Sequence, residues 1–251
     1  MSFIRGRQVF QERSELNRPA NGLLALGTVV ISAIVAVAFF RAFDGLFVGS
    51  TLVSQIMVIG MGPVLVAQMI LRRADFQARW GHRAFSVAFR WLAIPGLTLI
   101  GVGIAHFAWI EGERIVPHEI ALLPFAYLLI SGILLWLRAV IVFGIDNLSL
   151  LYVYFPQESR LIDANVYSVL RHPVYSAVLR IIFALALWNG SVFALFAGCF
   201  APLGMTAWLR LAEERELIER FGDGYREYRH RVPAFFNLNP RTWPVLWRFM
   251  L

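Results

Sequence analysis

The sequence contains no lysine: all 23 of its basic residues are arginine, against 16 acidic residues, for a formal net charge of +7. A mechanism that needs a lysine nucleophile or a Schiff base is therefore excluded. Charged residues make up only 16% of the chain, whereas soluble domains average about a quarter. Hydrophobic residues make up 59% and the mean hydropathy is +0.64. This balance indicates a protein whose surroundings are mostly lipid.

Cysteine is almost absent. Cys199 is the single cysteine and stands within an apolar run, so an intrachain disulfide and a cysteine metal cluster are both excluded. The five histidines are scattered along the chain, and we expect no structural or catalytic metal. The sequence also lacks a glycine-rich phosphate loop, an H-E-x-x-H motif and a plausible serine triad.

Long hydrophobic runs predict transmembrane helices, each of which needs about 20 mostly apolar residues. The sequence has four long runs and two shorter ones, at residues 21–40, 46–71, 91–110, 120–137, 178–188 and 192–209. The fourth can continue past Arg138 to Phe143. Asn189-Gly190-Ser191 separates the last two and predicts a tight helical hairpin, whose first arm we expect to begin near Pro173. The predicted fold class is all-α, a multi-pass membrane protein with about six spans.

The placement of arginine predicts the orientation. Arginines cluster before the first run, after the second and after the last, whereas the alternate connections hold few. The positive-inside rule then places both termini in the cytosol. We expect no cleavable signal, because the first twenty residues are polar and the run that follows is long enough to span. We also expect no nucleic-acid partner, since the arginines flank apolar runs.

Two stretches differ from a simple helical bundle. Residues 144–170 form a long connection that mixes charged and aromatic side chains, and they are either an interfacial loop or one wall of a cytosolic site. Residues 210–231 repeat apolar side chains at helical spacing and predict a C-terminal amphipathic helix on the cytosolic membrane surface. We therefore predict a transmembrane scaffold over residues 1–137 and a functional core over 138–251.

Ionisable groups close to apolar spans are costly and are the first candidates for function in membrane proteins. His106 lies within the third run, where a packed and hydrogen-bonded histidine is the commoner case. Arg138 lies late in the fourth run. It either extends to the membrane interface or points inward to a phosphate or carboxylate. Neither residue by itself predicts a site.

A stronger candidate is Arg171-His172-Pro173-Val174-Tyr175. Pro173 disfavours helix at the preceding residue and suits the first turn of a helix that starts there. A cation, an imidazole and a phenol thus surround a helix N-terminus, whose N–H groups favour an anionic ligand; the alternative is a basic membrane-flanking turn. Glu213 and Glu214 follow Arg210 by one turn. They either pair with it or, facing a cavity, attract an amine or sulfonium.

In this order, the blocks resemble those of the isoprenylcysteine carboxyl methyltransferase and phospholipid methyltransferase superfamily. That family shows R-H-P-x-Y-x-G, then a helical hairpin, R-x-x-E-E-x-x-L, F-G-x-x-Y-x-x-Y and a proline-containing hydrophobic end. The matching segments are 171–177, 210–217, 221–228 and 232–236, with Arg160-Leu161-Ile162 and Tyr167 resembling the approach to the first. Ala177 replaces a family glycine, which would narrow the space for a cofactor. Asn165-Val166 replaces Gly-Pro, which predicts a differently shaped loop.

The resemblance implies methyl transfer from S-adenosylmethionine to a lipophilic or membrane-delivered acceptor: an isoprenylcysteine-like carboxylate, a phospholipid amine or a small thiol. It assigns the cofactor pocket to Tyr167, His172, Pro173, Tyr175, Glu213 and Glu214. Arg171, Arg210 and Glu214 are the expected catalytic residues, with the two arginines holding the cofactor carboxylate or an anionic acceptor. Tyr225 and Tyr228 are expected to close the pocket rather than react.

Two other functions remain open from the sequence. A membrane reductase of the sterol-reductase type resembles this family in its C-terminal architecture but uses NADPH. A non-catalytic lipid-binding or transport protein is the second alternative, although transporters often show internal repeats and midplane polar groups. No such repeat is visible here, and the polar groups gather at one face.

Overall fold

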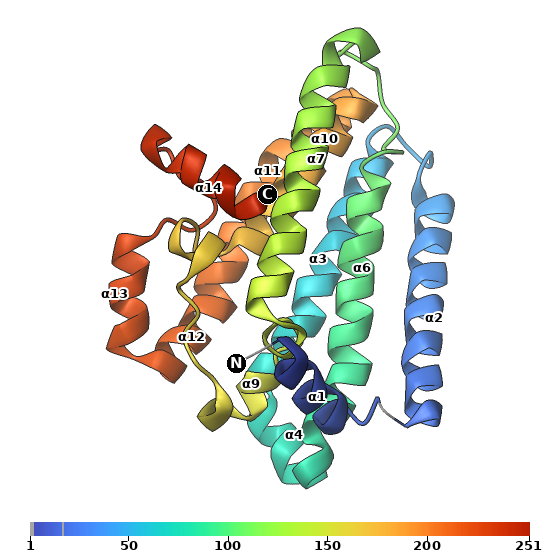
Figure 1. The fold of residues 1–251 in the computed structure, drawn as a ribbon. Coiled ribbons are helices and arrows are strands. Elements are labelled where there is room, and N and C mark those ends of the chain that lie inside the picture. The colour runs from blue at the N-terminus through green and yellow to red at the C-terminus, as the bar shows by residue number, and fades with distance from the viewer. Residues whose placement is uncertain (1–2, 17) are drawn as a thin grey trace.

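The computed structural model describes residues 3–16 and 18–251, and over these residues the chain is helical and has no β-strand. Five helical segments are long and apolar enough to cross a membrane: Pro19–Phe43, Ser50–Leu71, Arg73–His106, His118–Phe143 and Val192–Phe221. A sixth apolar helix, α10 (Pro173–Asn189), has 17 residues. The chain is thus a multi-pass helical membrane protein, as predicted (Figure 1).

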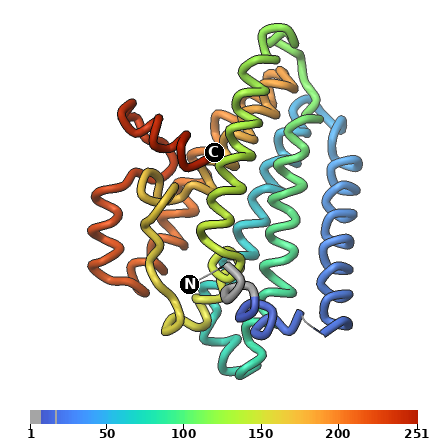
Figure 2. The backbone as a smooth tube through the Cα atoms, in the orientation of Figure 1, coloured from blue at the N-terminus to red at the C-terminus, as the bar shows by residue number. Residues whose placement is uncertain are grey.

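The helices alternate in direction through the bundle. In chain order they are α2 (Pro19–Phe43), α3 (Ser50–Leu71), the segment Arg73–His106 that ends in α6 (Ile94–His106), α7 (His118–Phe143), α10 and α11 (Val192–Trp208). α3 packs along α6 and α7 packs along α10 (Figures 1 and 2). Most apolar side chains of α2 are exposed, as expected for a helix that faces lipid.

Several predicted boundaries need correction. The third span does not reach residue 110 but ends at His106, and the helical segment that contains it begins at Arg73. The fourth helix does continue to Phe143, and the first arm of the hairpin does begin at Pro173. Residues 137 and 138, between which the predicted division falls, both lie in α7, and the division into scaffold and core stays a prediction.

The two ends of the bundle carry different structures. One end, which we call the site end, carries α1 (Phe3–Ser14), α4 (Arg73–Trp80), α8 (Ile145–Leu148) and α9 (Leu151–Tyr154), in the lower part of Figure 1. The other end, the loop end, carries the α6–α7 connection and the Asn189-Gly190-Ser191 turn, where Ile115 N–H donates to the Gly190 carbonyl at 2.8 Å.

His106 packs among three helical segments near the loop end of the bundle. Its buried ring stacks on Phe40, with centroids 3.6 Å apart, and its Nδ1 and Nε2 lie 2.9 Å from Gln55 Oε1 and 2.8 Å from Asp44 Oδ2. These partners come from α2, α3 and the turn between them. His106 is therefore a packed, hydrogen-bonded histidine, the commoner of the two cases that the sequence allowed.

Close contact between α3 and α6 depends on two glycines. A Cβ at Gly62 would lie 2.7 Å from the Gly96 carbonyl oxygen, and a Cβ at Gly96 would lie 2.7 Å from the Gly62 carbonyl oxygen. Real Cβ atoms do not approach backbone oxygen so closely. Small residues at such crossings let two helix backbones meet, which gains dispersion contacts that lipid cannot replace.

The C-terminal amphipathic helix is not one helix. α11 runs through a π-helical turn, η5 (Leu209–Glu213), into α12 (Glu214–Phe221), and Gly222 then breaks the helix with a φ of +56°. α13 (Asp223–Arg231) follows in a new direction (Figure 1). The left-handed φ suits glycine, which carries no Cβ. This break turns α13 back toward the start of α10 instead of leaving it extended.

Candidate functional site

A cavity of about 960 Å³, open to solvent, lies at the site end between the start of α10, α12, α13 and the connection 144–170. Its polar lining includes Arg160, Arg171, His172, Glu213, Glu216 and Arg220. Its aromatic lining includes Phe143, Tyr167, Tyr175, Phe221, Tyr225 and Tyr228. Of the two sequence readings of residues 144–170, the cavity wall is the one that the structure supports.

The start of α10 is fixed by the chain's C-terminal region. His172 has a non-helical backbone just before Pro173, with φ −123° and ψ 64°, as the proline predicts, and Pro173 is the first helical residue. The Arg171 N–H donates to the Pro233 carbonyl at 2.9 Å, and the His172 N–H donates to the Ala234 carbonyl at 3.0 Å. These two bonds hold the buried His172 side chain at the N-terminus of α10.

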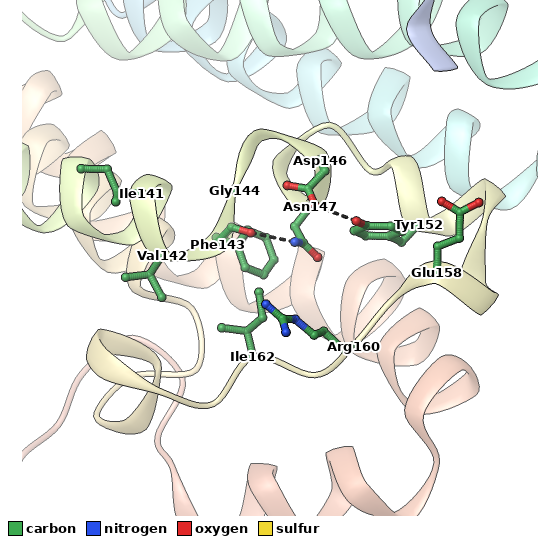
Figure 3. A pocket seen from close by; sticks show the side chains of 10 residues that line it. All are labelled: Ile141, Val142, Phe143, Gly144, Asp146, Asn147, Tyr152, Glu158, Arg160 and Ile162. Carbon is green, nitrogen blue, oxygen red and sulfur yellow. Dashed lines mark hydrogen bonds between the residues drawn. The ribbon is translucent and has the colours of Figure 1, made fainter. Parts of the chain in front are cut away.

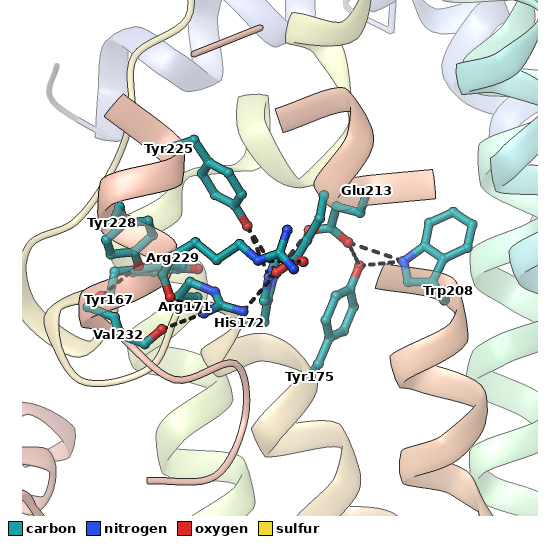
Figure 4. Close-up of polar contacts among 11 residues, drawn as sticks. Tyr167, Arg171, His172, Tyr175, Trp208, Glu213, Tyr225, Tyr228, Arg229 and Val232 are labelled. Carbon is teal, nitrogen blue, oxygen red and sulfur yellow. Dashed lines mark hydrogen bonds and ion pairs between the residues drawn. The ribbon is translucent and has the colours of Figure 1, made fainter. Parts of the chain in front are cut away.

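The His172 ring lies between two carboxylates. Its Nδ1 is 3.4 Å from Glu213 Oε1 and its Nε2 is 3.5 Å from Glu214 Oε1 (Figure 4). Burial lowers the pKa of His172, but hydrogen bonds and the charges of Glu213 and Glu214 outweigh it and raise that pKa above its usual 6.5. This shift favours the protonated imidazole, which places a positive charge beside the cavity.

Glu213 is further fixed by Tyr175 and Trp208. The Tyr175 hydroxyl donates to Glu213 Oε2, and the Trp208 indole N–H lies 3.1 Å from the same oxygen and 3.0 Å from the Tyr175 hydroxyl oxygen. Trp208 and Glu213 are five residues apart, a spacing that puts them on different faces of an α-helix. The π-helical turn η5 brings them to the same face, and such turns are frequent at functional sites.

Trp208 is a residue of the site that the sequence did not predict. Its only signal was its position five residues before the Glu-Glu pair, and α-helical spacing would have directed it away from that pair. In the structure it contributes the one indole N–H of the polar cluster drawn in Figure 4. Arg229 was missed too: its Nε lies 3.5 Å from Glu214 Oε2.

Glu214 does not line the cavity but lies behind His172. Its Oε1 accepts from Arg171 Nη2 at 2.8 Å and lies 3.4 Å from the Tyr225 hydroxyl. Arg171 also donates from Nη1 to the carbonyls of Arg229 and Val232, at 2.7 and 2.6 Å. Arg171 thus lines the cavity while its Nη1 group holds the end of α13 and its Nη2 group binds Glu214 at the start of α12.

Three tyrosines that the resemblance singled out, Tyr167, Tyr225 and Tyr228, line the cavity. Tyr167, in the 3₁₀ turn Asn165–Ser168, stacks on Phe143 with ring centroids 5.2 Å apart. The Tyr228 hydroxyl donates to the Tyr167 carbonyl at 2.7 Å, which ties α13 to this turn. Burial, with the nearby Glu214 charge, raises the pKa of Tyr225. Its phenol therefore stays protonated and donates, so Tyr225 and Tyr228 form a neutral wall.

Arg210 departs from its expected position. Its side chain is exposed and is not among the residues that line the cavity, because η5 turns it to the other side of the helix from Glu213. Arg138 lies half-buried within α7 and lines neither this cavity nor the second one described below. The arginines that line the cavity are instead Arg160, Arg171 and Arg220.

The two departures from the family pattern have smaller effects than expected. Ala177 is fully buried against α7, in a cluster with Leu135 and Ala139, and is not among the cavity-lining residues. It therefore does not narrow the cavity. Asn165 has a φ of +60°, the left-handed region that asparagine tolerates better than most residues. An asparagine there can keep the backbone conformation that a glycine would allow.

A second, smaller cavity of about 410 Å³ adjoins the first and shares with it Phe143, Asn147, Arg160 and Ile162 (Figure 3). Its other lining residues are Ile141, Val142, Gly144, Asp146, Tyr152 and Glu158. Asp146 is buried and accepts from the Tyr152 hydroxyl at 2.6 Å. One side of this cavity is the apolar end of α7, where Ile141 is 55% exposed.

These features fit a ligand with separated charges. The start of α10, the protonated His172 and Arg171 complement an anionic group. Glu213 complements a cationic group, and the tyrosines offer flat apolar surfaces. Groups of three or more metal-ligating side chains that could hold a metal ion do not occur over residues 3–16 and 18–251.

Comparison with known proteins was informative at the level of the family. No curated protein and no solved structure matches the chain. The family model described as phospholipid methyltransferase matches residues 123–224, from the first turns of α7 to the first residues of α13. This range holds every residue of the Glu213–His172–Tyr175 cluster. Residues 123–224 therefore form a phospholipid methyltransferase domain, and this domain belongs to the group of membrane methyltransferases that includes the isoprenylcysteine carboxyl methyltransferases.

Proposed function

We propose that the protein transfers a methyl group from S-adenosylmethionine to a lipophilic or membrane-delivered acceptor. The observation that carries this proposal is the buried cluster of His172 with Glu213 and Glu214 beside the 960 Å³ cavity. It lies at a helix N-terminus inside the matched methyltransferase domain. The sites for negative and positive charge lie side by side, as a zwitterionic sulfonium cofactor requires.

When bound, S-adenosylmethionine supplies an electrophilic methyl group on a positively charged sulfur. The protein's own groups would bind and orient the molecule that carries it. The N-terminus of α10, Arg171 and protonated His172 would hold its carboxylate. Glu213, kept in position by Tyr175 and Trp208, would lie against its ammonium or sulfonium. Tyr225 and Tyr228 would exclude water from one side.

Positioning supplies most of the rate enhancement in this scheme. An acceptor held in line by these residues would form its new bond to the methyl carbon as the carbon–sulfur bond breaks, which would leave a neutral thioether. No metal is needed, and correct alignment of donor and acceptor supplies a large effect. A carboxylate acceptor is already ionised, whereas an amine or thiol must lose a proton. The scheme is therefore compatible with three classes of acceptor: a carboxylate, an amine and a thiol.

The second cavity is the proposed route for the acceptor. Its apolar side is formed by the lipid-exposed end of α7, and its far side shares Asn147 and Arg160 with the cofactor cavity. An acceptor that entered from the bilayer would reach the shared wall with its polar end first. The N-terminal helices would serve as a scaffold: Arg73 of α4 pairs with Glu219 of α12 at 2.7 Å across the predicted boundary.

We further propose that the site end faces the cytosol, with both termini there. The arginine-rich segments at the chain start, at Arg72–Arg83 and after Arg210 support this orientation. A water-soluble cofactor would then enter the open cavity from the cytosol. This orientation can be tested with single cysteines that are placed near residue 112 or near residue 222. Each would then be labelled from outside intact cells. We expect modification at 112 only.

The decisive assay uses membranes that contain the full chain and S-adenosylmethionine with a tritiated methyl group. We expect label in the lipid or thiol extract, with the product identified by mass spectrometry. Glu213→Gln should abolish most of the incorporation and weaken the binding of S-adenosylhomocysteine in calorimetry, whereas Glu219→Gln, on the same helix but exposed, should not. NADPH oxidation without methyl incorporation would favour the reductase alternative. Binding of neither cofactor would favour a non-catalytic lipid protein.

A further inference from the structure

Two residues of α12 line the cofactor cavity outside the cluster around His172. Glu216 and Arg220 are one helical turn apart, and Arg220 Nη2 lies 2.6 Å from Glu216 Oε2. Their side chains are only 6% and 12% exposed, with Arg220 the more exposed. Glu216 follows Glu213 by three residues and therefore lies on the same face of the helix, about 4.5 Å further along its axis.

Each member of this pair has a polar atom without a partner. Glu216 Oε1 and Arg220 Nε are both buried, and neither makes a hydrogen bond to any residue that the structure describes. A buried polar atom that stays unpaired costs about 1–3 kcal/mol, and more when the group is charged. Such atoms are rare in native structures and often mark a place where a ligand or water completes the hydrogen bonds.

The other carboxylates of the region are already engaged. Glu213 uses both oxygens for His172, Tyr175 and Trp208, and Glu214 lies behind the cavity wall. Glu216 is thus a cavity-lining carboxylate with one oxygen left to accept hydrogen bonds. That oxygen has two lone pairs.

The charge balance of the pair selects the class of ligand. Glu216 and Arg220 already neutralise each other, so a further full charge would be repelled by one of them. An ammonium would satisfy Glu216 but leave Arg220 Nε unpaired, and an anion would do the reverse. A hydroxyl both donates and accepts, so a hydroxyl between these atoms satisfies both. Two neighbouring hydroxyls would use both lone pairs of Glu216 Oε1.

We propose that Glu216 and Arg220 form a binding site for the hydroxyls of a sugar ring, and that this ring is the ribose of the methyl donor. The inference rests on the proposed use of S-adenosylmethionine and adds the orientation of that molecule in the cavity. Its amino-acid end would be at the start of α10, and its ribose would be one turn further along α12. Glu216 stands at an unspecified position of the R-x-x-E-E-x-x-L block, and Arg220 lies between that block and the next, so the resemblance specifies neither residue.

The test is calorimetric titration of the full-length protein, purified in detergent, with three ligands. These are S-adenosylhomocysteine and its analogues that lack the ribose 2′- or 3′-hydroxyl. We expect the wild-type protein to bind at least one deoxy analogue about 10- to 100-fold more weakly than the parent, because a hydrogen bond to a charged group is lost. Glu216→Ala should weaken the parent ligand by a similar factor and no longer discriminate against that analogue.

Glu219→Ala is the matched control, since Glu219 lies on the same helix but is exposed and outside the cavity. It should retain the wild-type affinity and discrimination. Equal binding of all three ligands by the wild-type protein would overturn the ribose assignment alone, without any need for a variant. If the wild-type protein does not bind S-adenosylhomocysteine at all, the proposed function fails and the ribose assignment fails with it.

Discussion

The indole N–H of Trp208 and the carboxylate of Glu213 meet at 3.1 Å across a π-helical turn. This turn inserts an extra residue into the helix that joins the last membrane segment to the site. As a result, a tryptophan at the membrane boundary orients a carboxylate that lines the cavity. The Tyr175 hydroxyl completes the triangle from the neighbouring helix.

Trp208→Phe keeps the aromatic packing and removes only the N–H donor. Glu213 would then lose one of the bonds that fix its orientation. We expect S-adenosylhomocysteine to bind about 10-fold more weakly, with little change in thermal stability. Titration calorimetry measures the affinity. Trp243→Phe is the control, because the Trp243 indole N–H donates to the Asn237 carbonyl and neither residue lines the cavity. Equal losses in the two variants would contradict the assigned role.

The Arg171–Glu214 ion pair predicts a stability effect. Both side chains are about nine-tenths buried and their atoms are 2.8 Å apart. Removing one partner leaves a buried charge uncompensated, which costs about 3–5 kcal/mol. Glu214→Gln should therefore lower the melting temperature in detergent markedly. Glu219→Gln removes an exposed partner of Arg73 and should change it little. A smaller effect at Glu214 than at Glu219 would rule out this account.

The raised pKa of His172 predicts how stability depends on pH. A group whose pKa is higher in the folded than in the unfolded protein stabilises the fold fully below the unfolded value, near 6.5. That stabilisation is lost as the pH rises through the higher, folded pKa. The melting temperature of the wild-type protein should thus fall as the pH is raised from about 6 past neutrality. His172→Gln should show a weaker fall, and His230→Gln, at an exposed position on α13, should follow the wild type. A wild-type curve that rises over this range would refute the prediction.

The Gly62–Gly96 contact predicts that α3 and α6 tolerate no side chain at their crossing. Gly96→Ala places a Cβ 2.7 Å from the Gly62 carbonyl oxygen, so the helices must separate. Overpacking of this kind costs about 1–3 kcal/mol. We expect a lower melting temperature and a lower yield of folded protein. Gly101→Ala, on the same helix with open space around the new Cβ, is the control and should be neutral or stabilising. Similar behaviour of the two variants would contradict the close crossing.

Local sequence properties determined the membrane fold and the position of the site. Hydrophobic length predicts a spanning helix without any tertiary contact, and four of the long runs did become spanning helices. Pro173 set the start of α10, because its ring fixes φ and removes a donor that the first turn does not need. The order of the Arg-His-Pro and Glu-Glu blocks was sufficient to indicate the family.

Tertiary structure alone decided which side chains face the cavity. Arg210 and Glu213 look equivalent in the motif, but the π-helical turn exposes the first and directs the second inward. Trp208 joined the site through the same turn. The break at Gly222 folds α13 back so that Tyr225 reaches His172, 53 residues away in the sequence. Such outcomes depend on one inserted residue in a helix and on contacts between distant segments, and neither can be read from local hydrophobicity or helical spacing.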